Sequence, residues 1–148
     1  MSNELEIRTL ARGEESDWRR LWTAYLDFYE TSVPEHVYKG TFERLIDPAN
    51  TSQNAAIALK NGVPVGLVHY IVHPHNWKLE DVVYLQDLYT DVSARGAGVG
   101  RALIEYVYAF GDQNGTPGVY WLTQDFNAEA RMLYDRIATL TPFIRYNR

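Results

Sequence analysis

Apolar residues recur along this chain with two different periods, and the periods predict an alternation of strands and helices. Residues 5–10 alternate apolar and polar side chains, which is typical of a strand with one covered face. Residues 14–30 place aromatic and aliphatic side chains at i, i+3 and i+4, which predicts an amphipathic helix. Pro34 suits the first turn of a second helix, which we expect to end near Leu45.

A β-hairpin is predicted next. Residues 55–59 and 63–72 are apolar runs joined by Asn61-Gly62, the dipeptide that most strongly favours a two-residue hairpin turn. A loop over 73–77 and a buried strand over 81–92 should follow.

The last third of the chain predicts four more segments. These are a helix over 100–112, a short strand over 119–122, a helix from Asn127 as N-cap to about Ile137, and a closing strand over 143–146. The order β-α-α-β-β-β-α-β-α-β is that of an α/β (α+β) protein with a mixed sheet. Its 148 residues suit one domain, 1–148.

Glycines alternate with other residues where the strand over 81–92 meets the following helix. Gly96, Gly98 and Gly100 can take positive φ angles and allow a ligand close to the backbone. A helix N-terminus behind such a turn has free N–H groups and binds anions, phosphate above all. The stretch lacks the Lys-Ser or Lys-Thr of a nucleotide P-loop, and its glycines are one residue too close for a dinucleotide fingerprint.

The stretch from Arg95 resembles the (Arg/Gln)-x-x-Gly-x-(Gly/Ala) loop of the GNAT superfamily of acetyl-CoA-dependent N-acetyltransferases, with Gly98 and Gly100 at its fixed positions. The preceding strand, 85–90, and the segment 127–134 are also similar to that family, and the order of elements matches its topology over nearly the whole chain. The resemblance implies a single-domain fold with helices on both faces of a mixed central sheet. It also implies transfer of an acetyl group from acetyl-CoA to a primary amine of a small molecule, nearest to the diamine (spermidine/spermine) branch.

The composition of the chain limits the possible routes of acetyl transfer and the possible acceptors. The chain has no cysteine, so the acetyl group cannot pass through a protein thiol, and direct attack by the amine in a ternary complex is expected. A net charge of −5 argues against nucleic acid and mildly favours a cationic acceptor. No apolar run is long enough to span a membrane, and residues 1–10 do not resemble a signal peptide, so we expect a cytoplasmic protein.

The resemblance assigns the cofactor site. Backbone N–H groups of the glycine loop would hold the pyrophosphate, Asn127 would contact the pantetheine, and Tyr134 would protonate the leaving thiolate. The pantetheine arm would lie along 88–90, which requires the fourth and fifth strands to splay apart. Asn127 also fits a simple N-cap and Tyr134 a core aromatic, although the glycine loop upstream favours the functional interpretation. The full expected set is Leu88, Tyr89, Thr90, Arg95, Gly96, Ala97, Gly98, Val99, Gly100, Arg101, Asn127 and Ala130.

The general base is left open. Gln86, expected with Tyr134 in the catalytic centre, stands where the diamine branch often has glutamate, and an amide does not accept a proton usefully. A water chain or another carboxylate would then serve, and Asp87 would point to the opposite face in a regular strand. A backbone N–H near Leu88 is expected to meet the oxyanion. Other candidate carboxylates are Glu35, Glu80, Asp81 and Asp125.

Aromatic and acidic residues of the first two helices and of the 73–80 loop suit a cationic acceptor, although an ordinary amphipathic helix has a similar covered face. The expected acceptor residues are Tyr25, Phe28, Tyr29, Glu35 and Trp77.

Three histidines, His69, His73 and His75, gather in sequence. His69 and His73 would lie about 13 Å apart on one strand face, so no metal site is expected. A peptide or protein amine is an alternative acceptor, and a non-catalytic acyl-CoA-binding module or a nicotinamide-dinucleotide-binding domain is an alternative function. The single strand after the last helix leaves an edge that a second copy could cover, and a homodimer is expected.

Overall fold

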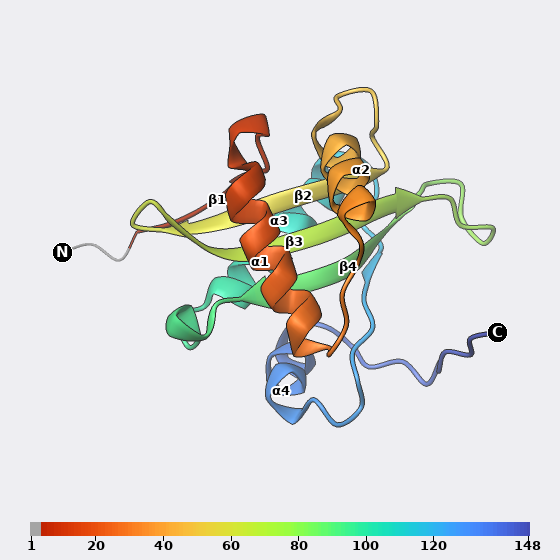
Figure 1. Ribbon diagram of the computed structural model, residues 1–148. Coiled ribbons are helices and arrows are strands. Elements are labelled where there is room, and N and C mark those ends of the chain that lie inside the picture. The colour runs from red at the N-terminus through yellow and green to blue at the C-terminus, as the bar shows by residue number, and fades with distance from the viewer. Residues whose placement is uncertain (1–3) are drawn as a thin grey trace.

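A computed structural model describes residues 4–148 and contains one mixed sheet of five strands in the order β1-β2-β3-β4-β5 (Figure 1). Neighbours from β1 to β4 pair antiparallel, whereas β4 and β5 pair parallel. Residues 1–3, the start of the segment compared with signal peptides, lie outside the description. The strands are β1 (Leu5–Thr9), β2 (Gln53–Lys60), β3 (Val63–His73), β4 (Val82–Thr90) and β5 (Val119–Tyr120).

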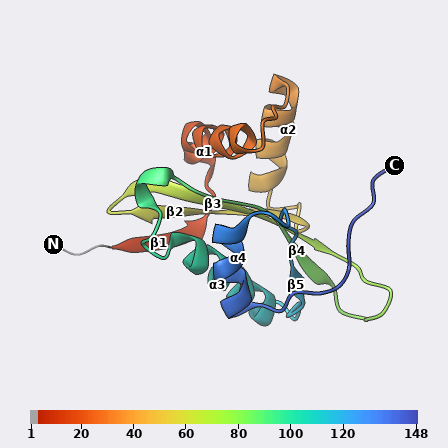
Figure 2. The same ribbon diagram turned by 90° about the horizontal axis from the view of Figure 1, so that it is seen from below.

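Two helices cover each face of the sheet, as expected (Figure 2). One layer holds α1 and α2, and the opposite layer holds α3 and α4. Short 3-10 turns precede α1 and follow β4. The helices are α1 (Glu15–Phe28), α2 (Glu35–Ile46), α3 (Val99–Gln113) and α4 (Ala128–Ile137).

Each layer encloses its own core because alternate residues of the central strands point to opposite faces. Ile57 and Leu67 pack on the α1 and α2 side, around a fully buried Trp18. Val68 and Leu103 are buried on the α3 side.

The predicted hairpin is confirmed. Asn61 and Gly62 take φ angles of 50° and 81°, and the residues flanking them, Lys60 and Val63, are paired. Two consecutive positive φ angles match the right-handed twist of the strands, and asparagine and glycine tolerate them at low cost.

The predicted closing strand over 143–146 is wrong. No strand follows α4, and the side chains of Phe143, Ile144 and Tyr146 are 79%, 78% and 88% exposed. Pro142 cannot donate to a ladder, and β5, only two residues long, offers the segment no matching edge. The fifth strand is also shorter than expected, because the chain leaves β4 after Tyr120.

Candidate active site

The splay that the cofactor site requires is present between β4 and β5. The two strands pair only at Val83 with Val119 and at Tyr84 with Tyr120. From Leu85 to the end of β4, the pairing is with β3 alone. One edge of β4 is therefore open to a ligand along 85–90.

A cavity of about 430 Å³ opens where α4, the end of β4 and the start of α3 meet. It contains most of the expected cofactor residues, and it adds four that the sequence did not indicate: Ala94, Glu129, Leu133 and Arg136. The expected residues that line it are Leu88, Thr90, Arg95, Gly96, Gly98, Val99, Gly100, Arg101, Asn127, Ala130 and Tyr134.

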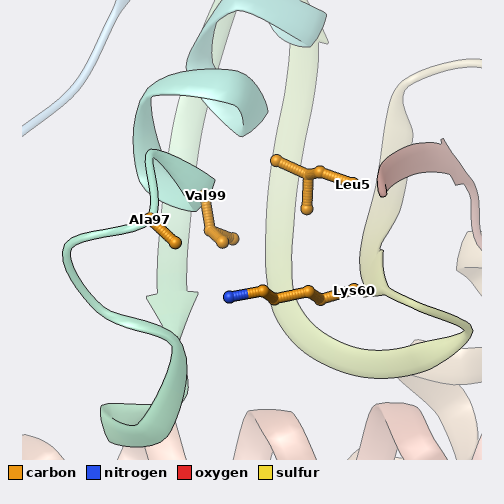
Figure 3. Close-up of a pocket in the computed structure, with 4 residues that line it drawn as sticks. All are labelled: Leu5, Lys60, Ala97 and Val99. Carbon is orange, nitrogen blue, oxygen red and sulfur yellow. The ribbon is translucent and has the colours of Figure 1, made fainter. Parts of the chain in front are cut away.

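Two expected cofactor residues lie elsewhere. The side chain of Tyr89 belongs to the core on the α1 and α2 side of the sheet. Ala97 lines a smaller cavity of about 160 Å³ with Leu5, Lys60 and Val99, and the Lys60 side chain extends across it (Figure 3). Tyr89 can offer its backbone, but not its ring, to a ligand in the larger cavity.

The position just before α3, at the end of the glycine loop, has a backbone conformation that favours glycine. Gly98, the residue that caps the start of α3, has a φ of 79°, and a Cβ atom there would meet nothing within 4 Å. Its glycine is therefore required by backbone conformation rather than by crowding. The first turn of α3 contains no acidic side chain, so its free N–H groups and the helix dipole favour an anion.

Tyr134 lies on α4 with its ring against Trp121, the ring centroids being 5.4 Å apart. Burial, with a smaller contribution from the phenol of Tyr29, raises the pKa of Tyr134 to about 12. The phenol therefore keeps its proton at neutral pH and can act as a hydrogen-bond or proton donor toward the cavity.

The buried phenols predict a loss of stability in alkali. Burial raises the pKa of Tyr70 and that of Tyr134, so both hold the proton more tightly in the folded chain than in the unfolded one, where a phenol ionises near pH 10. This stabilisation is complete below about pH 10 and is lost as the pH rises through the folded pKa. We expect each phenol to lower the free energy of unfolding by about 1.4 kcal/mol per pH unit in that window. Urea unfolding at a series of pH values measures this dependence. Above about pH 10, the free energy of unfolding of Tyr70→Phe should fall less steeply with pH than that of the unaltered protein. An equal dependence on pH in the two proteins would contradict the role of the Tyr70 phenol.

Gln86 forms a β-bulge in β4. His69 pairs with Asp87 and Tyr70 pairs with Leu85, so Gln86 has no partner on β3. The strand is thus not regular, and the extra residue changes which face the following side chains occupy. Asp87 lies on the α1 face, where a regular strand would have placed Gln86.

Asp87 is the centre of a hydrogen-bond network on that face. Its Oδ2 atom lies 2.7 Å from Nδ1 of His69 and accepts a hydrogen bond of 3.3 Å from the indole N–H of Trp22. The indole of Trp18 donates to Nε2 of His69 over 2.9 Å. Sequence reasoning missed this network because its residues are far apart in the chain.

The expected acceptor residues do not all come together. Tyr25 and Tyr29 lie near Asp87. Burial is the main cause that raises the pKa of both phenols, and the negative charge of Asp87 is the second. Phe28 is 56% exposed at the end of α1. Glu35 is ion-paired with Arg19 at 2.7 Å, and Trp77 is 85% exposed in the loop between β3 and β4.

Each of the three histidines that gather in the sequence takes part in a hydrogen bond. His69 belongs to the Asp87 network, while Nε2 of His73 lies 2.8 Å from the hydroxyl of Tyr120. His75 accepts a hydrogen bond from the backbone of Trp77. Across residues 4–148, no three acidic or histidine side chains gather in a metal-binding arrangement. In the same range no helix is both long and apolar enough to cross a bilayer.

Comparison with known families decides the class of protein. Residues 18–138 match the model of the acetyltransferase (GNAT) family. The chain belongs to this family. A relative of this acetyltransferase is the D-amino-acid N-acetyltransferase HPA3 of Saccharomyces cerevisiae, which is 38% identical over 149 residues and is matched over 100% of this chain and 92% of its own length.

Solved structures agree on the fold of the acetyltransferase. The aminoglycoside N-acetyltransferase AAC(6')-Iy in complex with CoA superposes with a TM-score of 0.85 at 18% identity, over 100% of this chain and 96% of the other. The ribosomal-protein-alanine N-acetyltransferase of Brucella melitensis biovar Abortus 2308 has a TM-score of 0.81 at 19% identity, over 98% and 99% of the two chains. The expected family, fold, enzyme class and acetyl-CoA cosubstrate are confirmed.

Proposed function

We propose that this acetyltransferase transfers the acetyl group of acetyl-CoA directly to the primary amine of a small molecule. The observation that carries the proposal is the cavity of about 430 Å³ between the open edge of β4 and α4, with the glycine loop at one end and Tyr134 in its lining. The same cavity contains the elements that a long, anionic, thioester-bearing cofactor needs.

The cofactor is proposed to lie along the cavity. The pyrophosphate would occupy the N-terminus of α3, where the loop over 95–101 offers N–H groups. The pantetheine would extend along the open edge of β4 over 88–90 and meet Asn127 and Ala130 of the α4 end, like an added strand. Asn127 supports this role because, although it precedes α4, its side chain makes no capping hydrogen bond.

Replacing Gly98 with alanine tests the loop. Alanine at a φ of 79° is strained, so we expect the free energy of unfolding to fall by about 1–2 kcal/mol and the affinity for acetyl-CoA to fall several-fold. Gly115→Ala is the matched control, since Gly115 has a φ of 72° and equal space but does not line the cavity. Calorimetric titration with acetyl-CoA measures both variants, and equal affinity in the two would contradict the placement of the pyrophosphate.

Chemistry is assigned to the end of the cavity that holds Tyr134. We propose that its phenol protonates the CoA thiolate as the C–S bond breaks, and that the backbone N–H of Leu88 stabilises the oxyanion. Gln86, unpaired and exposed at the bulge, would contact the acceptor as a polar group rather than remove its proton.

An α-amino acid is the proposed class of acceptor. The support is the relative HPA3, named as a D-amino-acid N-acetyltransferase and similar to this chain over its whole length. Thiol release from acetyl-CoA should be measured with D- and L-amino acids, diamines such as spermidine, and a lysine peptide. Turnover with D-amino acids above the other classes is expected. Turnover with diamines alone would indicate a diamine acetyltransferase instead. Tight binding of acetyl-CoA without any turnover would favour a non-catalytic acyl-CoA-binding module.

A homodimer is also proposed, through the segment after α4. Leu140, Phe143, Ile144 and Tyr146 are each more than 70% exposed, and the segment forms no strand. A second copy of this chain could cover these apolar side chains. Sedimentation should give a dimer for the full chain and a monomer after deletion of residues 140–148. A monomeric full chain would contradict the proposal.

A further inference from the structure

The rings of Tyr84 and Tyr120 form a stack that belongs to neither core of the molecule. Their centroids lie 4.9 Å apart, and their planes differ by 14°. Within residues 4–148, neither ring joins the core on the α3 side or the core beneath α1 and α2. Tyr84 is half-buried and Tyr120 is 43% exposed. The stack is therefore an aromatic surface that the chain itself leaves partly open.

The alternation of side chains along the strands places this stack on one face of the sheet. Val83 and Leu85, which flank Tyr84, belong to the core on the α3 side. The residues that flank Tyr120, which are Val119 and Trp121, pack against the same core. Because successive side chains of a strand point to opposite faces, both tyrosines stand on the face that α1 and α2 cover in part. A ligand can reach them there without entering the cavity between α3 and α4.

His73 fixes the position of Tyr120 in the stack. Its Nδ1 atom lies 2.8 Å from the carbonyl oxygen of the next residue, which can only accept, so Nδ1 carries the proton. In the neutral ring, Nε2 then accepts from the hydroxyl of Tyr120 over 2.8 Å. His73 pairs with Val82, two residues before Tyr84, so the Tyr120 ring lies on the Val82 side of Tyr84. The opposite face of the Tyr84 ring is turned toward Gln86.

The stack stands where β4 and β5 separate. Tyr84 with Tyr120 is the last pair between the two strands, and the open edge of β4 begins at the next residue. Trp121, which follows Tyr120, has its ring centroid 5.4 Å from that of Tyr134 on the opposite face of the sheet. Gln86 is about 7 Å further along β4 than Tyr84. The aromatic surface and the proposed proton donor therefore flank the same opening in the sheet.

We propose that the Tyr84 ring, backed by Tyr120, binds the side chain of the acceptor and makes this acetyltransferase select amines that carry an aromatic ring. The inference rests on the proposed transfer function. With the amino group at the open edge beside Gln86, a ring attached to the α-carbon extends back along β4 onto Tyr84. Aromatic rings in stacked or edge-to-face contact attract one another beyond the area that they bury. An acceptor with a methyl group in place of the ring lacks this contact.

The ratio of kcat/KM for D-phenylalanine to kcat/KM for D-alanine tests the role of Tyr84. In the unaltered enzyme we expect this ratio to be about 10 or more. Tyr84→Leu keeps an apolar side chain but loses the aromatic face, and should lower the ratio by about 3- to 10-fold through D-phenylalanine alone. Tyr84→Phe keeps the ring and should leave the ratio within about 2-fold. Affinity for acetyl-CoA, measured by calorimetric titration, should be equal in all three proteins.

Two controls separate selectivity from a purely structural role of the stack. Cross-strand aromatic pairs also stabilise a sheet, so Tyr84→Leu is expected to lower Tm, but a loss of stability acts on both acceptors equally and does not change their ratio. Tyr146→Leu makes the same substitution at a side chain that is 88% exposed after α4, and should leave the ratio unchanged. The pair 2-phenylethylamine and ethylamine repeats the comparison without a carboxylate in the acceptor.

The outcomes distinguish this inference from the proposed function. Equal kcat/KM for the two amino acids in the unaltered enzyme, or an unchanged ratio in Tyr84→Leu, would overturn the role of Tyr84 and leave acetyl transfer to amines standing. Turnover of the two simple amines alone would overturn the amino-acid acceptor class, and their ratio would then decide the role of Tyr84. No turnover with any amine would overturn the proposed function and the inference together.

Discussion

Replacing Tyr134 with phenylalanine is expected to lower kcat by about 10²- to 10⁴-fold, the usual contribution of a positioned acid. The phenol lines the cavity proposed for the cofactor, and its pKa of about 12 keeps it protonated at neutral pH. Phenylalanine preserves the ring contact with Trp121 but removes the proton that the leaving thiolate needs. Steady-state thiol release with saturating acetyl-CoA measures the effect.

Two controls make the Tyr134 prediction specific. Binding of acetyl-CoA to Tyr134→Phe should be nearly unchanged, because the glycine loop and the β4 edge are the elements proposed to hold the cofactor. Tyr146→Phe removes a hydroxyl from a side chain that is 88% exposed and should leave kcat unchanged. A Tyr134→Phe enzyme with full kcat would show that the thiolate leaves without this phenol, and Tyr134 would then be a core aromatic only.

Replacing Trp18 with alanine is expected to lower the free energy of unfolding by about 3–5 kcal/mol. Trp18 is fully buried, and its ring lies 5.2 Å from that of Trp22 and 5.3 Å from that of Phe42. The substitution opens a large cavity in the core beneath α1. It also leaves Nε2 of the buried His69 without a donor, which adds a desolvation cost.

Substitution of an exposed tryptophan shows whether the loss of stability comes from the burial of Trp18 or from the residue type. Trp77→Ala removes a side chain that is 85% exposed, and a change within about 0.5 kcal/mol is expected. Trp18→Phe should fall between the two, since it keeps most of the volume but loses the indole N–H. Urea unfolding of the three variants gives the order, and a Trp18→Ala protein as stable as Trp77→Ala would contradict the packing described here.

Much of this site can be predicted from local sequence. The turn from Arg95 to Gly100 combines glycine spacing, a preceding apolar strand and a following helix, and each of these signals lies within a few residues. The Asn61-Gly62 hairpin is equally local. Most of the cofactor residues expected from the sequence accordingly line one cavity, whereas the ring of Tyr89 and Ala97 lie elsewhere.

The α1 face of β4 could not be predicted in the same way. The bulge at Gln86 carries no glycine or other local signal, yet it decides which face Asp87 occupies. The partners of Asp87 depend on a histidine from β3 and tryptophans from α1 that meet only in the folded chain. The segment 143–146 has the composition of a strand, but a strand needs a neighbour, and β5 is too short to provide one.

The amine is proposed to attack acetyl-CoA directly while both are bound to this chain. Initial rates of thiol release, with acetyl-CoA and D-phenylalanine varied together, test it most directly. Because the chain has no cysteine to hold the acetyl group, reciprocal plots are expected to intersect, as they do for a ternary complex. Parallel lines would show an acetylated enzyme and would contradict direct transfer.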